Sequence, residues 1–176
     1  MFEKLNYRSN RSVDLGEDFI NGQGCGAVSI CRYGLFPMSY NGCEIIAAYN
    51  LGLMLGIKKP LCEIAKEIYP YGSLFCGLFG THPYALARYF KDNGFGTHMN
   101  KDYYTFKKNF AKHSFGVVSF WNGKSVFKGL HTVAVENFDG GVRVYNKSNK
   151  ADCAVVFNTL DDYLDSERFI CGYYVD

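Results

Sequence analysis

The chain has 176 residues, of which 48% are hydrophobic and 20% charged, and its formal net charge is +2. This composition is typical of a globular chain that buries a core, and it excludes an intrinsically disordered protein. No concentrated basic stretch stands out and the most apolar run, 45–57, is too short for a bilayer, so we expect no nucleic-acid partner and no membrane segment.

The cysteines and histidines predict neither a disulfide framework nor a metal site. The seven cysteines are odd in number and form no CxxC pair, and the N-terminus has no signal-like apolar stretch. We therefore expect a cytoplasmic protein with reduced thiols. The four histidines show no ligand spacing to one another or to cysteine, so we predict no metal and no cofactor. The oligomeric state is left open.

The first half of the chain is predicted to be mainly helical. Residues 1–42 are predicted to be mostly loop, with a short strand near 26–33. A helix over 43–57 is apolar nearly all round, which is typical of a helix in the centre of a domain. The pattern then predicts a helix at 60–69, opened by Pro60, a glycine-rich loop at 71–81, a helix at 82–94, a short strand at 95–99 and a helix at 101–112.

The second half is predicted to be strand-rich. Strands are expected at 115–121, 129–138, 141–146 and 168–175, with turns at Asn122-Gly123 and Asp139-Gly140 and a short helix at 159–165. Helices followed by antiparallel strands predict an α+β fold rather than alternating βαβ units. We therefore expect one domain, 1–176, whose N-terminal helical half packs a buried central helix on a C-terminal antiparallel sheet.

Three residues of this arrangement form a candidate catalytic triad. Cys43 opens the central helix, whose positive N-terminal end would lower the pKa of its thiol. His131 lies near the start of one strand, and Asn146 ends the strand that follows the turn at Asp139-Gly140. A tight hairpin places His131 and Asn146 side by side, so the Asn146 amide could fix the imidazole while His131 takes the thiol proton.

Each of these residues also has a purely structural interpretation. Free cysteine is commonly buried in a core, a histidine in an apolar strand is usually a packed residue, and asparagine after a strand is usually a turn residue. Three rival residues stand elsewhere in the sequence: Cys25 as nucleophile, His82 as base and Asp139 as orienting group. We rank them lower, because no helix pattern follows Cys25, His82 precedes a helix, and Asp139 lies in the turn itself.

The segments "YNGCEIIAAYNLGLMLG" and "LHTVAVENFDGGVRVYN" resemble the papain-like cysteine peptidase superfamily. The resemblance covers roughly residues 38–150 and is closest to the bacterial peptidases that remove double-glycine leaders from bacteriocin precursors. It implies a papain-like fold and a thiol hydrolase that cleaves a peptide or amide bond without a cofactor. Cys43 would be the nucleophile, His131 the base and Asn146 the orienting residue.

The chain departs from that family at two positions. Glu44 stands where the family has glycine after the cysteine, and Pro37 stands where it has the glutamine that binds the oxyanion. Asn41 is the nearest amide and is expected to serve instead, with Gln23 as a more distant alternative. Two other functions stay open: an acyltransferase or transglutaminase-like enzyme on the same triad, and a binding module whose catalytic site has decayed.

Overall fold

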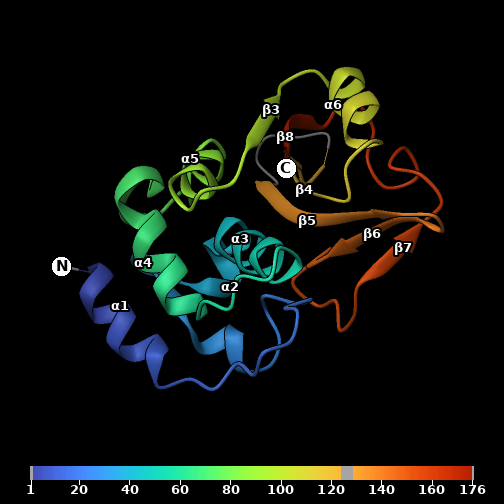
Figure 1. The fold of residues 1–176 in the computed structure, drawn as a ribbon. Helices are drawn as coiled ribbons and strands as arrows, with labels where there is room; N and C mark the ends of the chain where they lie inside the picture. Colours follow the sequence, from blue (N-terminus) through green and yellow to red (C-terminus); the bar gives the residue numbers. More distant parts are fainter. Residues whose placement is uncertain (1, 124–128, 176) are drawn as a thin grey trace.

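The structure is a computed structural model that describes residues 2–123 and 129–175. Most helices come first along the chain, and most strands come second (Figure 1). In the described residues the helices are α1 (Phe2–Arg11), α2 (Met38–Asn41), α3 (Cys43–Met54), α4 (Leu61–Gly72), α5 (Ala85–Asp92) and α6 (Tyr103–Phe110), with short 3-10 helices η1 (Ala27–Ile30) and η2 (Phe75–Gly77).

The strands form one small sheet and one large one. In the small sheet, β1 (Arg32–Tyr33) pairs with β2 (Phe36–Pro37). The large sheet has six strands, in the spatial order β3 (Thr97–Asn100), β8 (Phe169–Val175), β4 (Phe115–Trp121), β5 (Leu130–Phe138), β6 (Gly141–Tyr145) and β7 (Val155–Phe157). Every neighbouring pair in it is antiparallel. The predicted α+β class with an antiparallel sheet is therefore confirmed.

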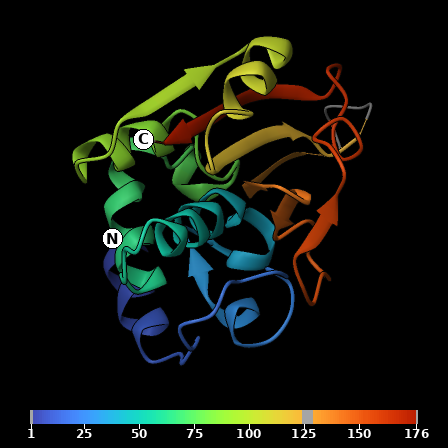
Figure 2. The ribbon, with the colours of Figure 1, turned by 45° about the vertical axis from the view of Figure 1, so that its right-hand side comes forward.

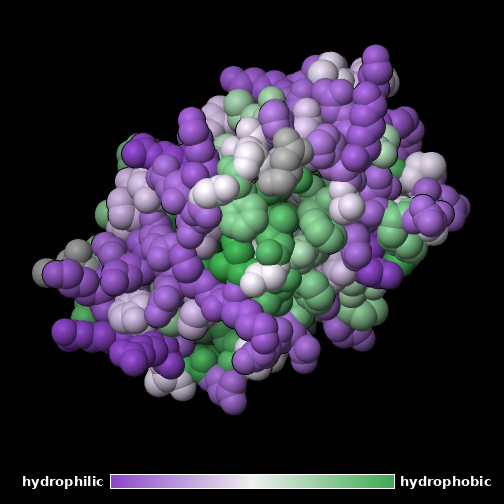
Figure 3. Space-filling model, viewed as in Figure 1, coloured by the Kyte–Doolittle hydropathy of each residue, from purple (hydrophilic) through white to green (hydrophobic). Residues whose placement is uncertain are grey.

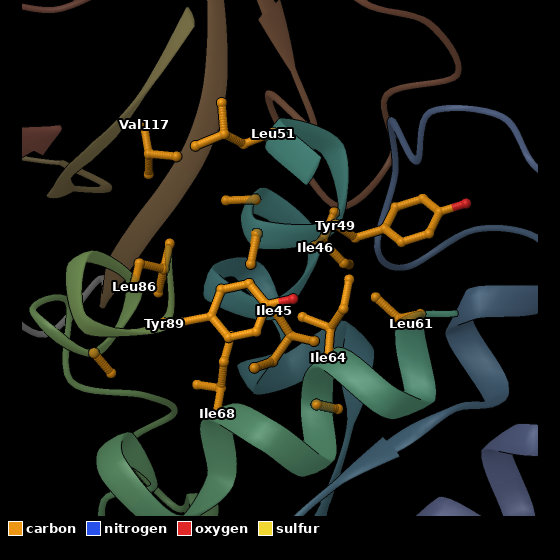
Figure 4. Close-up of a cluster of buried hydrophobic side chains, with 14 of the residues drawn as sticks. Ile45, Ile46, Tyr49, Leu51, Leu61, Ile64, Ile68, Leu86, Tyr89 and Val117 are labelled. Carbon is orange, nitrogen blue, oxygen red and sulfur yellow. The ribbon is translucent and has the colours of Figure 1, made fainter. Parts of the chain in front are cut away.

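The predicted central helix is confirmed as α3, which packs against β5 and β4. Figure 4 shows its side chains surrounded by residues of α4, α5 and the sheet. Asn50, the polar residue in this apolar helix, is fully buried, and its amide bonds both the N–H and the carbonyl of Ile20. Its burial is therefore compensated by two hydrogen bonds that hold the N-terminal segment on the helix.

A second hydrophobic cluster fills the other face of the sheet. Phe106 and Phe110 of α6 pack there with Val118, Val133 and Val135 of β4 and β5. Figure 2 shows α6 on the far side of the sheet from α3. Residues of the same strands therefore alternate between the two cores, because successive side chains of a strand point to opposite faces.

The ends of the confirmed elements follow the expected capping chemistry. The helix after 82 is confirmed as α5, and it ends at Asn93 and Gly94, where Gly94 has φ +89°. The two-residue turn at Asp139-Gly140 is confirmed by the pairing of Phe138 with Gly141. Asn122 and Gly123 bend the chain after β4, and residues 124–128 of this connection lie outside the described residues.

Two predicted elements are wrong. The segment 26–33 was expected to be a strand, but it forms a 3-10 turn followed by the short β1. Gly26 has φ +57°, and the Ser29 hydroxyl donates a hydrogen bond to the Gly26 carbonyl, so the chain turns here instead of extending. The predicted helix at 159–165 is a single turn. Asp162 accepts hydrogen bonds from the N–H and the hydroxyl of Thr159, which closes this turn locally.

The N-terminal helix α1 was not predicted, since 1–42 was expected to be mostly loop. It packs on α4, where the Lys66 ammonium lies 4.9 Å from the centre of the Tyr7 ring. This tertiary contact supports a helix whose sequence is polar on average.

The surface is uneven in polarity. Figure 3 shows apolar residues gathered near the middle of one face and hydrophilic residues around them. The hydrophobic cluster around α3 is incompletely covered. Four residues at the end of α3 and just after it are only partly buried, namely Leu53, Met54, Leu55 and Ile57. No helix among the described residues combines the length and the apolar character that a bilayer-spanning segment needs.

Candidate active site

Cys43 is the first residue of α3 and lies against the beginning of β5. A side chain at Gly42, which precedes it, would collide with Met38, so glycine permits the close turn between α2 and α3. Cys43 as a residue is 6% exposed. Its sulfur lies 3.0 Å from Glu44 Oε2 and 4.0 Å from the carbonyl oxygen of Leu130, the residue before His131. The fold therefore brings the predicted nucleophile to the strand of the predicted base.

The environment of the thiol does not lower its pKa as predicted. Burial raises the pKa of Cys43 well above its usual value of 9.0, and the negative charge of Glu44 raises it further. The backbone N–H of Thr132 acts in the opposite direction, but it is a smaller effect. The dipole argument considered the helix alone, whereas desolvation by the sheet and a buried carboxylate dominate here. The resting thiol is therefore protonated at neutral pH.

His131 is buried in a fixed orientation. Its Nε2 lies 2.7 Å from the backbone carbonyl oxygen of Asn146, and its ring packs edge-on against Phe120. Because a carbonyl oxygen can only accept, Nε2 carries the proton and Nδ1 is the basic nitrogen of the neutral ring. Burial lowers the pKa of His131 from 6.5, and the backbone hydrogen bonds at Asn146 and Lys147 oppose this effect. The imidazole is therefore neutral at neutral pH.

The predicted proximity of His131 and Asn146 is found, but the bond between them is not the predicted one. The Asn146 backbone carbonyl holds the imidazole, while its side chain bonds Gln23. Asn146 Oδ1 accepts from the Gln23 backbone N–H at 3.1 Å, and Asn146 Nδ2 donates to Gln23 Oε1 at 3.0 Å. Asn146 has φ +58°, a left-handed conformation that asparagine tolerates better than most residues. This left-handed conformation directs the backbone carbonyl of Asn146 to His131 and its side-chain amide to Gln23.

Asn41 and Gln23, the two amides considered for the oxyanion, are both engaged elsewhere. Asn41 Nδ2 donates to the carbonyls of Tyr33 at 2.8 Å and Gly77 at 2.6 Å. Gln23 Nε2 donates to the carbonyl of Ser39 at 3.1 Å. Contrary to the prediction, the Asn41 amide has no hydrogen left for an oxyanion in this structure. It instead fixes the loop before α5 to the end of α2.

Glu44 is buried beside the thiol, with 2% of its surface exposed. Its Oε1 lies 3.4 Å from the hydroxyl of Thr132, which in turn lies 2.9 Å from the hydroxyl of Ser119 on β4. Burial raises the pKa of Glu44 from 4.5 to about 7, although hydrogen bonds from Cys43, from Thr132 and from the backbone oppose this rise. The second residue of the helix is therefore part of the site, and it does not point into solvent.

Thr132 and Ser119 were missed by sequence reasoning. The sequence did contain a sign of a buried polar contact, because each is a hydroxyl residue inside a mostly apolar strand. Thr132 lies in "HTVAV" and Ser119 in "FGVVSFW". Both are fully buried. They face each other across the paired strands β4 and β5, where their hydroxyls bond each other, and the Thr132 hydroxyl also reaches Glu44.

The rival residues have other surroundings. Cys25 is exposed, and its thiol donates to the Asn149 carbonyl. His82 Nδ1 accepts the N–H of Tyr84, the residue before α5, as its predicted place near a helix start requires. Asp139 lies in the turn between β5 and β6.

The described residues hold no cluster of metal-ligating side chains, and all seven cysteines are free. A cavity of about 790 Å³ lies between residues 10–17 and residues 58–63, and none of the four predicted site residues lines it. No family model matches the chain, and no curated protein matches it.

Proposed function

We propose that this protein is a papain-like cysteine hydrolase that cleaves a peptide or small amide bond through Cys43. The observation that carries the proposal is the position of the Cys43 sulfur at the N-terminus of a buried helix, against the residue that precedes His131. A nucleophile and a titratable base on facing elements are the minimum that covalent acyl transfer requires.

The proposed roles of Cys43 and His131 follow from a protonated thiol and a neutral imidazole at neutral pH. Cys43 attacks the substrate carbonyl and forms a thioester, which water then hydrolyses. His131, neutral and with Nδ1 unprotonated, is suited to activate that water, and the Asn146 carbonyl keeps the ring in place. N–H groups at the start of α3, which have no acceptor within the helix, are the available oxyanion donors because the amides of Asn41 and Gln23 are engaged.

The proposal is tested by acylation with p-nitrophenyl acetate at about pH 8, followed by peptide mass spectrometry of all seven cysteines. We expect an acetyl thioester on Cys43 that turns over, and we expect Cys43→Ala to abolish both. Cys62→Ala is the matched control, because Cys62 is also a buried helical cysteine. Acetylation confined to the exposed Cys25, Cys76 and Cys153 contradicts the proposal.

The same experiment separates hydrolysis from acyl transfer. When glycinamide is added, a hydrolase continues to release mainly acetate, whereas an acyltransferase releases mainly N-acetylglycinamide. The ratio of the two products therefore decides between the enzymatic alternatives that share this triad.

A second candidate, a papain-like binding domain without catalysis, is favoured by a separate observation. The side-chain amides of Asn41 and Gln23 donate to backbone carbonyls within the fold, and the thiol of Cys43 is protonated and bonded to Glu44. This candidate predicts that Cys43 forms no acetyl thioester, and that Cys43→Ala changes stability alone.

A further inference from the structure

The carboxylate of Glu44 is the nearest hydrogen-bond acceptor of the Cys43 thiol. The sulfur lies 3.0 Å from Glu44 Oε2, compared with 4.0 Å from the Leu130 carbonyl oxygen. Among the described residues, no hydrogen bond joins the thiol to His131. Both Cys43 and Glu44 are buried, at 6% and 2% exposure, so bulk water does not compete for the thiol proton.

The position of the carboxylate is fixed on both sides. One oxygen, Oε1, is 3.4 Å from the Thr132 hydroxyl on β5, which is itself tied to Ser119. The backbone of Thr81 also contributes a hydrogen bond to Glu44. The loop that carries Thr81 approaches closely, since a side-chain carbon added at Gly80 would lie 3.6 Å from Glu44 Oε2. These contacts leave Oε2 directed at the sulfur.

The charge state of Glu44 changes near neutral pH, because burial raises its pKa to about 7. Burial raises the pKa values of the thiols and phenols around it, so these neighbours are uncharged at neutral pH. The titratable neighbours of the carboxylate are Cys43 on α3, Tyr33 on β1, and Cys171 and Tyr173 on β8.

We propose that Glu44 is the group that accepts the thiol proton when Cys43 attacks the substrate carbonyl, an inference that rests on the proposed hydrolase function. His131 was predicted to be this base, but the side chain to which the thiol donates a hydrogen bond is Glu44, at 3.0 Å from Oε2. A protonated thiol has no thiolate to offer, so its proton must leave as the sulfur attacks.

The reaction balances without any further reactant. As the sulfur–carbon bond forms, the S–H proton passes to Glu44 Oε2 and the carbonyl electron pair moves onto the oxygen. When this intermediate collapses, the C–N bond breaks and the leaving nitrogen takes the proton from Glu44. Water then attacks the thioester with His131 Nδ1 as base, and the departing sulfur recovers that proton. Glu44 is thereby a catalytic residue of the acylation step.

The test is the pH dependence of Cys43 acetylation by p-nitrophenyl acetate in the wild type and in Glu44→Gln, from about pH 5 to about pH 9. In the wild type we expect the rate to rise with a midpoint at about 7, as Glu44 ionises. In Glu44→Gln we expect this rise to disappear, and the rate at about pH 8 to fall by about 100-fold.

Equal or faster acetylation of Cys43 in Glu44→Gln overturns the proposal, because it shows that the charge of Glu44 merely suppresses the thiolate. If Cys43 of the wild type does not react, the proposed hydrolase function fails as well. Reaction in the wild type that survives Glu44→Gln removes only the role of Glu44. The two failures are therefore distinguishable.

A second variant keeps the test decisive if Glu44→Gln fails to fold. Thr132→Val removes a hydrogen bond that lowers the pKa of Glu44 and preserves the shape of the side chain. We expect the midpoint of the rate profile to move to higher pH in Thr132→Val. An unmoved midpoint assigns the titration to another group and overturns the proposal.

Discussion

The reciprocal pair of Asn146 and Gln23 is expected to be one of the most sensitive points of the fold. Asn146 is fully buried and Gln23 is 3% exposed. In Asn146→Ala the backbone N–H and the Oε1 of Gln23 both lose their partners. Each unpaired buried group costs about 1–3 kcal/mol, so we expect the free energy of unfolding to fall by about 4 kcal/mol.

The backbone conformation adds to this cost. Alanine in the left-handed region is strained by about 1 kcal/mol, and Asn146 has φ +58°. Asn146→Gly removes the same amide without this strain, so it is the matched control. We expect Asn146→Gly to be more stable than Asn146→Ala by about 1 kcal/mol.

Urea unfolding followed by circular dichroism measures both differences. The lost partners and the strain together cost about 5 kcal/mol, so with a slope of about 2 kcal/mol/M, Asn146→Ala should lower the midpoint by about 2.5 M relative to the wild type. A loss below about 1 kcal/mol would refute the buried pair with Gln23. A glycine variant less stable than the alanine variant would refute the left-handed conformation.

Three further predictions concern other buried contacts. Because the pKa of Glu44 is raised from 4.5 to about 7, the native state binds this proton more tightly than the unfolded state, and the free energy of unfolding should fall by about 3 kcal/mol as the pH rises from about 4.5 to above 7. Urea unfolding at about pH 5 and about pH 8 measures this pH dependence, which Glu44→Gln should remove. An unchanged pH dependence in Glu44→Gln contradicts its assignment to Glu44. Gly172→Ala would place a carbon 2.6 Å from the Phe106 ring, and should cost about 1–3 kcal/mol in the same assay; a neutral effect argues against this packing. The Tyr103 hydroxyl lies 2.8 Å from the Leu164 carbonyl, so Tyr103→Phe should lower stability by about 1 kcal/mol, measured by thermal unfolding, and an unshifted transition argues against the bond.

Features that depend only on neighbouring residues could be predicted from the sequence. The apolar residues nearly all round the segment that begins at Cys43 are sufficient to predict a buried helix, and most residues of α3 are indeed buried. Alternating strands separated by Asp139-Gly140 predict the β5–β6 hairpin, and with it the closeness of His131 and Asn146. Periodicity and turn chemistry are local, so they can be read without knowledge of the rest of the chain.

The atoms through which these residues contact one another depend on the packing of distant segments. Asn146 holds His131 by its carbonyl because its side chain bonds Gln23, 123 positions earlier in the chain. Asn41 is likewise engaged by Gly77, and Glu44 by Thr132. A polar side chain pairs with whichever buried partner the packing brings within reach, and that partner comes from a distant segment that no local pattern specifies. The protonation of Cys43 has the same origin, because burial under the sheet outweighs the helix end that the sequence reveals.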